Sequence, residues 1–338
     1  MQNAKWKVKS AKSGAFNFVF CVLQFVLCAA LVSVANASGE GILFPRREEL
    51  NGAVEFWKRV FASYGTDQGV VHDSEDLTVV YGVEGLGSRA EQGRDRERER
   101  AQKTILERYR KALAYFAEGE ADTTRLSGDE LRVWNALGGT TDRRRYRRAM
   151  GQLRVQVGQR DRFEQGLAAS EPYMEDIRSI LRKNGVSDSL AVLPFIESAF
   201  NIRASSKAGA VGLWQITRAT GRRFLRINRR VDERRDPMKA TVAAARILKE
   251  NYELLGTWPL AITAYNHGPW GMSRAVKALG TQDIVTIIRR YKGKSFGFAS
   301  RNFYPEFLAA LDVIHHRQAY YGDLPPLAED TIPDKGRR

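Results

Sequence analysis

Cysteine is almost absent from this 338-residue sequence, and the two that occur, Cys21 and Cys28, both lie near its beginning. If the protein is exported and cleaved after these two cysteines, the mature chain has no disulfide and no thiolate metal site. Packing then has to supply its stability. Histidine is also scarce, and the four histidines lack the spacing of a zinc motif: His72, His267, His315 and His316. The sequence therefore predicts no metal site.

Long hydrophobic runs are equally rare, and the one clear run extends from Gly14 to Val34. Four lysines precede it and the small residues Ala35-Asn36-Ala37 follow it, which is the pattern of a secretory signal peptide. We expect residues 1–37 to be removed, the mature chain to begin at Ser38, and the protein to reach the periplasm or cell envelope. The run is also long enough to cross a bilayer, so an uncleaved segment that associates with the membrane is the alternative.

Acidic residues are outnumbered, because 54 lysines and arginines face 39 aspartates and glutamates, which gives a net charge of +15. Loss of the signal peptide would remove four lysines and no acid, and would leave +11. This excess favours an anionic partner, which is nucleic acid, anionic lipid or a cell-wall polymer. Export argues against nucleic acid. The 43% of hydrophobic residues exclude a disordered chain, and the length suggests two modest domains.

Residues 38–165 are predicted to form a mostly helical accessory region. Apolar spacing predicts an amphipathic helix within residues 45–64, and Val70-Val71 with Leu77–Tyr81 predict a small β-hairpin. Alternating arginine and glutamate over residues 89–111 indicates a solvated helix with ion pairs between turns rather than a binding tail. The five arginines within residues 143–148 either contact an anionic polymer or lie at an exposed helix end, and the sequence leaves both open.

Residues 166–322 are predicted to form an all-α domain, because strand patterns are nearly absent from this range. A tail over residues 323–338 is predicted to follow. Ser170 is expected to cap one helix and Asp236 another. Three prolines fall where first-turn prolines belong: Pro194, Pro237 and Pro259.

Glu197 conflicts with its surroundings, because it lies in the apolar run Phe195–Phe200. Burying a carboxyl is expensive, and desolvation raises its pKa toward the value of ~6 that suits a general acid at neutral pH. The alternative is an acid at the edge of the core or in an ion pair. Residues 204–216 follow as a loop rich in small residues, which lets the backbone approach a ligand closely and favours the catalytic interpretation.

Three segments occur in a specific order: Glu197–Asn201, the loop 204–216, and Ala264–Gly268. Together they resemble the lysozyme-like transglycosylase (SLT) domain of glycoside hydrolase family 23. More closely, residues 171–316 resemble the membrane-bound lytic murein transglycosylase D group of that family. The resemblance implies a mainly α fold, in which a lysozyme-like (goose-type) helical domain follows the accessory region.

The resemblance also implies roles for single residues. Glu197 corresponds to the sole catalytic acid and base. The residues that match substrate-binding positions are Ser206, which would contact the N-acetyl group, and Gly212, Trp214, Gln215, Tyr265 and Asn266. Trp214 is equally well explained as a core residue. Asp232 and Asp236 are expected to cap turns and helices rather than to act as a second acid.

The implied substrate is the glycan strand of peptidoglycan, and the implied reaction needs no metal or cofactor. Glu197 would protonate the bond after N-acetylmuramic acid, and the sugar's own 6-hydroxyl would then close a 1,6-anhydro ring. Two alternatives remain open on the sequence: a goose-type hydrolase that uses water, and a non-catalytic wall-binding protein.

One segment departs from the family pattern. Relatives commonly have Glu-Thr-x-x-Tyr before their last helix, whereas this chain has Ala299-Ser300-Arg301-Asn302-Phe303. The glutamate of that pattern supports the active-site tyrosine, so we expect the Tyr265 hydroxyl to lack its partner. The competing hypothesis is that Glu306, one turn further along, supplies the support.

Overall fold

The structure is a computed structural model that describes residues 43–87, 95–119 and 121–322. The predicted signal peptide and the predicted C-terminal tail lie outside these residues. Within the described ranges no helix is long and apolar enough to cross a membrane.

The accessory region begins with the short 3-10 helix η1 (Glu48–Leu50) and the helix α2 (Asn51–Ala62), which confirms the predicted amphipathic helix over a shorter range. Its apolar stripe is buried, and α2 packs against α14 (Phe298–His315) and α6 (Arg160–Ser170). The indole of Trp57 donates to Asn302 Oδ1 at 3.3 Å. The first helix is thus joined to helices of the C-terminal half.

The sheet has three antiparallel strands in the order β2-β1-β3, with bounds β1 Gln68–Asp73, β2 Val80–Gly85 and β3 Leu153–Val157. The β1–β2 pair confirms the predicted hairpin, although β2 begins three residues later than expected. The third strand was not predicted. Its sequence Leu-Arg-Val-Gln-Val alternates as a strand should, but it follows α5 (Arg143–Gln152) with no turn residue to announce it.

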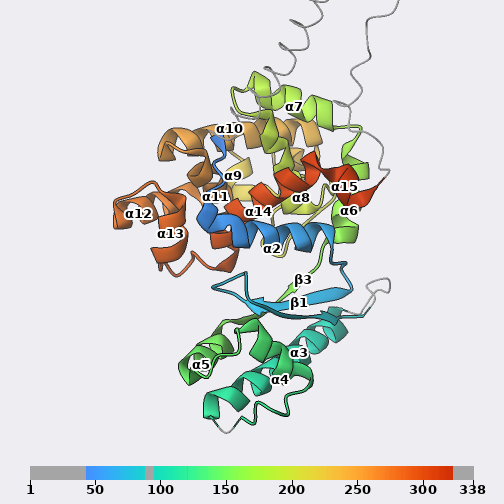
Figure 1. The fold of residues 1–338 in the computed structure, drawn as a ribbon. Helices are drawn as coiled ribbons and strands as arrows, with labels where there is room; N and C mark the ends of the chain where they lie inside the picture. The colour runs from blue at the N-terminus through green and yellow to red at the C-terminus, as the bar shows by residue number, and fades with distance from the viewer. Residues whose placement is uncertain (1–42, 88–94, 120, 323–338) are drawn as a thin grey trace, which may run out of the picture. The chain divides into compact units, whose positions relative to one another are not determined.

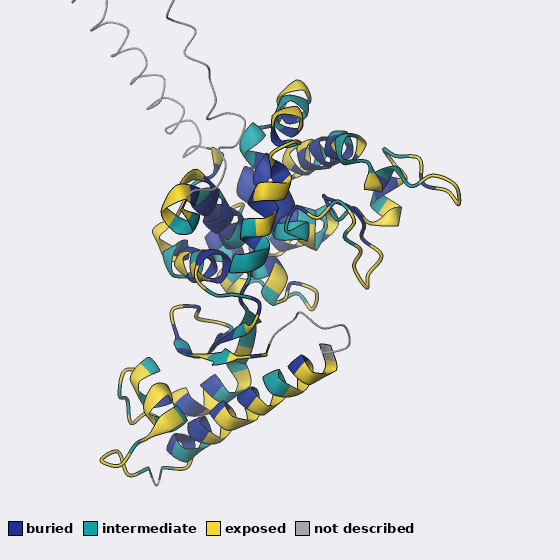
Figure 2. Cartoon of the chain, turned by 90° about the vertical axis from the view of Figure 1, so that its right-hand side faces the viewer, coloured by how far each residue is buried: buried dark blue, intermediate teal, exposed yellow. Residues whose placement is uncertain are grey.

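Helices α3 (Asp95–Glu118), α4 (Gly128–Ala136) and α5 pack together beneath this sheet. The Arg/Glu-rich segment is helical, as predicted, from Asp95 onward, and its residues 89–94 lie outside the described ranges. Figure 2 shows exposed residues along the outer face of α3 and buried residues along its inner face. In the basic cluster of α5, Arg143 donates to the carbonyl of Gly119 at 3.2 Å and Arg147 to that of Ala117 at 3.1 Å. Two of the five arginines therefore bind carbonyls at the C-terminal end of α3, where cations are favoured.

The C-terminal half is helical throughout, and no strand is assigned after residue 157 within the described part of the chain. Its helices are α7 Met174–Lys183, η2 Asp188–Val192, α8 Leu193–Ser198, α9 Arg218–Gly221, η3 Glu233–Arg235, α10 Pro237–Leu255, α11 Trp258–His267, α12 Pro269–Leu279, α13 Ile284–Arg290, α14 and α15 Arg317–Tyr321. Helices α7, α10, α11 and α14 pack successively on one another (Figure 1). The mainly α fold is confirmed.

The helix boundaries follow local chemistry with one exception. Asp236 accepts bonds from the amides of Met238 and Lys239, as a cap should, and the three first-turn prolines lie as predicted. Ser170 is not an N-cap: it is the last residue of α6, and its hydroxyl donates to the carbonyl of Leu167 at 2.7 Å. Residue 166, where we placed the domain boundary, falls inside α6.

Candidate active site

Glu197 lies next to the end of α8, a helix of six residues that stops in an unusual way. The two residues after Ser198 adopt left-handed conformations, Ala199 with φ 49° and Phe200 with φ 57°. Such conformations are costly for residues other than glycine and are typical of functional sites. The Ser198 hydroxyl donates to the carbonyl of Leu213 at 2.8 Å and joins this turn to the following loop.

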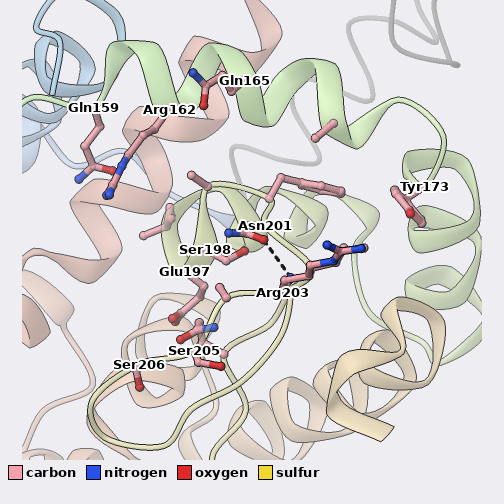
Figure 3. A pocket seen from close by; sticks show the side chains of 17 residues that line it. Gln159, Arg162, Gln165, Tyr173, Glu197, Ser198, Asn201, Arg203, Ser205 and Ser206 are labelled. Atoms are coloured by element: carbon pink, nitrogen blue, oxygen red, sulfur yellow. Dashed lines mark hydrogen bonds between the residues drawn. The ribbon is translucent and has the colours of Figure 1, made fainter. Parts of the chain in front are cut away.

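A cleft of about 1020 Å³ opens beside this turn. One wall comes from Gln159, which precedes α6, and from Arg162 and Gln165 on that helix, as Figure 3 shows. The opposite side contains Glu197 and Ser206. Of the described residues that line the cleft, Glu197 alone carries a carboxylate. The cleft therefore has one candidate acid.

Burial away from water raises the pKa of Glu197 to about 8, and no described residue contributes a charge or hydrogen bond to this shift. The side chain keeps part of its surface exposed to the cleft. The carboxyl is consequently protonated at neutral pH, which is the state that a general acid needs.

A second carboxyl, that of Glu306 on α14, lies within electrostatic range of Glu197. Its pKa is raised to about 8, first by burial and then by the negative charge of Glu197, while the Arg154 guanidinium partly opposes the shift. Glu306 is not among the residues that line the cleft. Its pKa responds to the charge of Glu197, but its side chain does not line the cleft.

The loop 204–216 has the backbone geometry of a tight ligand-facing turn. Gly212 has φ 78°, and a Cβ atom there would lie 2.1 Å from the carbonyl oxygen of Arg234, so the position requires glycine. Gln215 has φ 45°, and its side-chain amide donates to the carbonyl of Gly212 at 2.8 Å. Ser206 is exposed at the cleft, and its hydroxyl accepts from the amide of Ala210 at 3.0 Å.

Arg234 is a site-building residue that the sequence did not single out. Its buried guanidinium donates to the carbonyls of Gly209 (2.9 Å) and Ile216 (3.0 Å), and it pairs with Asp232 at 2.7 Å. Asp232 also accepts from the Arg234 amide, so its role is structural, as expected. The segment Asp232-Glu233-Arg234-Arg235 gave no signal because alternating charges usually lie on a solvated surface.

Trp214 is completely buried, and its indole donates to the hydroxyl of Thr241 at 2.9 Å. This placement favours the core interpretation over stacking on a sugar. Its backbone carbonyl has a different use, because it accepts a hydrogen bond from Tyr265.

The Tyr265 hydroxyl donates to the carbonyl of Trp214 at 2.8 Å. The expectation of a phenol without a partner is therefore wrong, because the hydroxyl is bound to a backbone oxygen. Burial and then the negative charge of Glu197 raise the pKa of Tyr265 well above its usual value, so the phenol stays neutral. Asn266 is exposed, and its side-chain oxygen accepts from the hydroxyl of Ser300 at 3.1 Å.

Glu197, Ser206 and Gln215 thus share one cleft, whereas Tyr265, Asn266, Gly212 and Trp214 are not among its lining residues. Tyr265 nevertheless lies within electrostatic range of Glu197. No cluster of three or more metal-ligating side chains occurs within the described ranges.

Tyr265→Phe is expected to lower turnover three- to tenfold, because a net hydrogen bond of about 0.5–1.5 kcal/mol is lost and the Trp214 carbonyl loses its donor. Ala299→Glu is expected to leave turnover unchanged, because Ala299 is exposed and the phenol already has a partner. Turnover on purified glycan strands measures both. If turnover rises with Ala299→Glu but not with Ala299→Gln, a carboxylate at this position would improve the site, and the expectation would be wrong.

Comparison with known proteins places this site in context. Residues 177–288 match the family model described as Transglycosylase SLT domain. The chain is 32% identical over 169 residues to the membrane-bound lytic murein transglycosylase D of Escherichia coli (strain K12), and equally to that of Escherichia coli O6:H1. This stretch is 47% of the chain and 35% of each relative, so the chain spans about a third of their length. A protein of Alteromonas sp. (strain M-1) named for tributyltin chloride resistance is 36% identical over 111 residues, which are 32% of this chain and 54% of that protein.

Proposed function

We propose that this chain, whose residues 177–288 form a transglycosylase SLT domain distantly homologous to lytic murein transglycosylase D, is itself a lytic transglycosylase of peptidoglycan. It would cleave the β-1,4 bond between N-acetylmuramic acid and N-acetylglucosamine without water. The observation that carries the proposal is the single carboxylate of the cleft, because glycosidases that use water generally need two.

The mechanism follows from the protonation state of Glu197. Its carboxylic acid gives a proton to the glycosidic oxygen as the bond from C1 to that oxygen breaks. The acetamido group of the same sugar stabilises the cation at C1. The 6-hydroxyl oxygen then bonds to C1 while its proton passes to the Glu197 carboxylate, which restores the acid and leaves a 1,6-anhydromuramic end.

Mass spectrometry of the soluble products from purified sacculi tests the proposal. We expect anhydro ends, which are lighter than reducing ends by one water. Reducing ends would identify a hydrolase, and intact strands would identify a non-catalytic binding protein.

The hydrolase is the second candidate, and the observation in its favour is Glu306, a carboxyl within electrostatic range of Glu197. A base that activates water has to reach the substrate, however, and Glu306 does not line the cleft. The non-catalytic alternative rested on the altered segment at residues 299–303, and the anchored Tyr265 weakens that support.

Export to the periplasm or cell envelope is part of the proposal, and it rests on the charge and apolarity of residues 1–37. N-terminal sequencing of the protein recovered from an envelope fraction tests it. A start at Ser38 supports removal of the segment, and a start at Met1 supports a membrane-bound form.

Binding to the wall is expected to weaken as salt rises, because a chain of net charge +11 after processing meets an anionic polymer. Exposed charges are screened within about 8 Å at 0.15 M ionic strength. Pelleting of the Glu197→Gln protein with sacculi at increasing sodium chloride measures this. Retention that does not change at high salt would indicate a specific sugar-binding site instead.

A further inference from the structure

A second cavity of about 960 Å³ adjoins the cleft. The two share Arg162 and Gln165, which lie one turn apart on α6, so that helix forms a wall of both. The second cavity, here called the side pocket, is otherwise lined by the end of α2, the start of α6 and the ends of β1 and β2, including Thr66 and Gly85. A substrate that lies in the cleft beside Glu197 can therefore extend a branch across α6.

Of the four charged side chains that line the side pocket among the described residues, Asp161 and Arg160 have partners, whereas Arg162 and Asp67 have none. Both carboxylate oxygens of Asp161 are occupied, one by the amide and one by the hydroxyl of Thr66, each at 2.7 Å. The Arg160 guanidinium lies 5.7 Å from the centre of the Tyr321 ring. Arg162 is half-buried, and no hydrogen bond or ion pair joins it to another described residue. A half-buried guanidinium at the junction of two cavities is suited to bind a carboxylate.

The walls of the side pocket fit a peptide better than a further sugar. None of the described residues that line it is aromatic, so it offers no flat apolar face on which a sugar ring can stack. Three lining residues are glycines, Gly65, Gly85 and Gly87, and their lack of side chains lets an extended chain approach the wall closely. Exposed Asp67 adds a negative charge that an amine can meet.

We propose that the side pocket receives the peptide stem attached to the muramic acid in the cleft, and that Arg162 binds a carboxylate of that stem. This inference rests on the proposed function, because it names the part of the same substrate that leaves the cleft. Arg162 would act as a specificity-determining residue that favours glycan with stems over glycan from which an amidase has removed them.

Calorimetric titration of the Glu197→Gln protein with two glycan oligomers, one with stems and one without, tests this without any need for turnover. We expect the oligomer with stems to bind about five- to tenfold more tightly, as befits one partly exposed charge pair. Adding Arg162→Gln should bring the ratio of the two affinities close to one. Adding Arg148→Gln, an equal loss of charge at an exposed position on α5, should keep the ratio.

Gly85→Leu provides a second variant that does not depend on charge. A Cβ atom at Gly85 meets no other heavy atom within 4 Å, so the side chain can fill the pocket without disturbing the fold. It should reduce the ratio as Arg162→Gln does. Equal affinity for both oligomers, or an unchanged ratio in both variants, would overturn the inference. The proposed function fails separately, if the parent protein releases no anhydro ends from either oligomer.

Discussion

Glu197→Gln is expected to abolish the release of anhydro ends, with a loss of about 10² to 10⁴ in rate, because the amide keeps the shape of the acid and has no proton to give. The fold should remain. The pKa of Glu197 is raised to about 8 in the folded protein, whereas in the unfolded chain it has the ordinary value of a glutamate. As the pH rises from that ordinary pKa toward 8, the free energy of unfolding falls, because the unfolded chain releases a proton that the folded protein keeps. The amide variant should therefore unfold at the same temperature as the parent, or higher, at neutral pH.

Glu306→Gln is the matched control, because it removes a neighbouring carboxyl that does not line the cleft. It should retain activity within about tenfold of the parent, which corresponds to ~1.4 kcal/mol in the barrier.

The parent's rate should fall above about pH 8, where Glu197 loses its proton. Activity of Glu197→Gln within tenfold of the parent would remove Glu197 from the mechanism.

The sequence predicted the parts of the site that depend on local pattern. An acid in an apolar run identified Glu197, and burial does raise its pKa, further than we expected. The resemblance identified Gly212 within the small-residue loop, and its positive φ and contact with the Arg234 carbonyl admit no side chain. Pattern was sufficient here because each residue type is dictated by its own backbone or its own burial.

Contacts between distant segments could not be predicted in the same way. Tyr265 and Trp214 are 51 positions apart, and the bond between the hydroxyl of one and the carbonyl of the other uses a backbone atom that every residue has. The altered segment at residues 299–303 suggested that the Tyr265 hydroxyl lacks a partner, although the fold brings the Trp214 carbonyl within hydrogen-bond distance of it. The third strand escaped notice for a related reason, because its pairing with β1 joins residues about 85 positions apart, as His72 with Arg154 or Val71 with Val155.

Arg234→Met is expected to lower the free energy of unfolding by about 2–4 kcal/mol, because removing one member of a buried pair leaves the other groups unmatched. The loss would affect Asp232 and the carbonyls of Gly209 and Ile216 together. We place the value below the full range for buried pairs because Asp232 retains 21% of its side-chain exposure. Denaturant unfolding at neutral pH measures the change.

Arg226→Met separates this effect from a general loss of charge in the same segment. Its guanidinium pairs with Glu233 at 3.0 Å but is 73% exposed, so its removal should cost far less stability than removal of the buried Arg234 guanidinium. Arg234→Met should also lower activity more than Arg226→Met does, because Arg234 binds the carbonyls of Gly209 and Ile216 in the loop that contains Ser206 and Gln215. Equal losses in the two variants would mean that the loop keeps its shape without the buried guanidinium, and that its glycines and turns are sufficient to form the site.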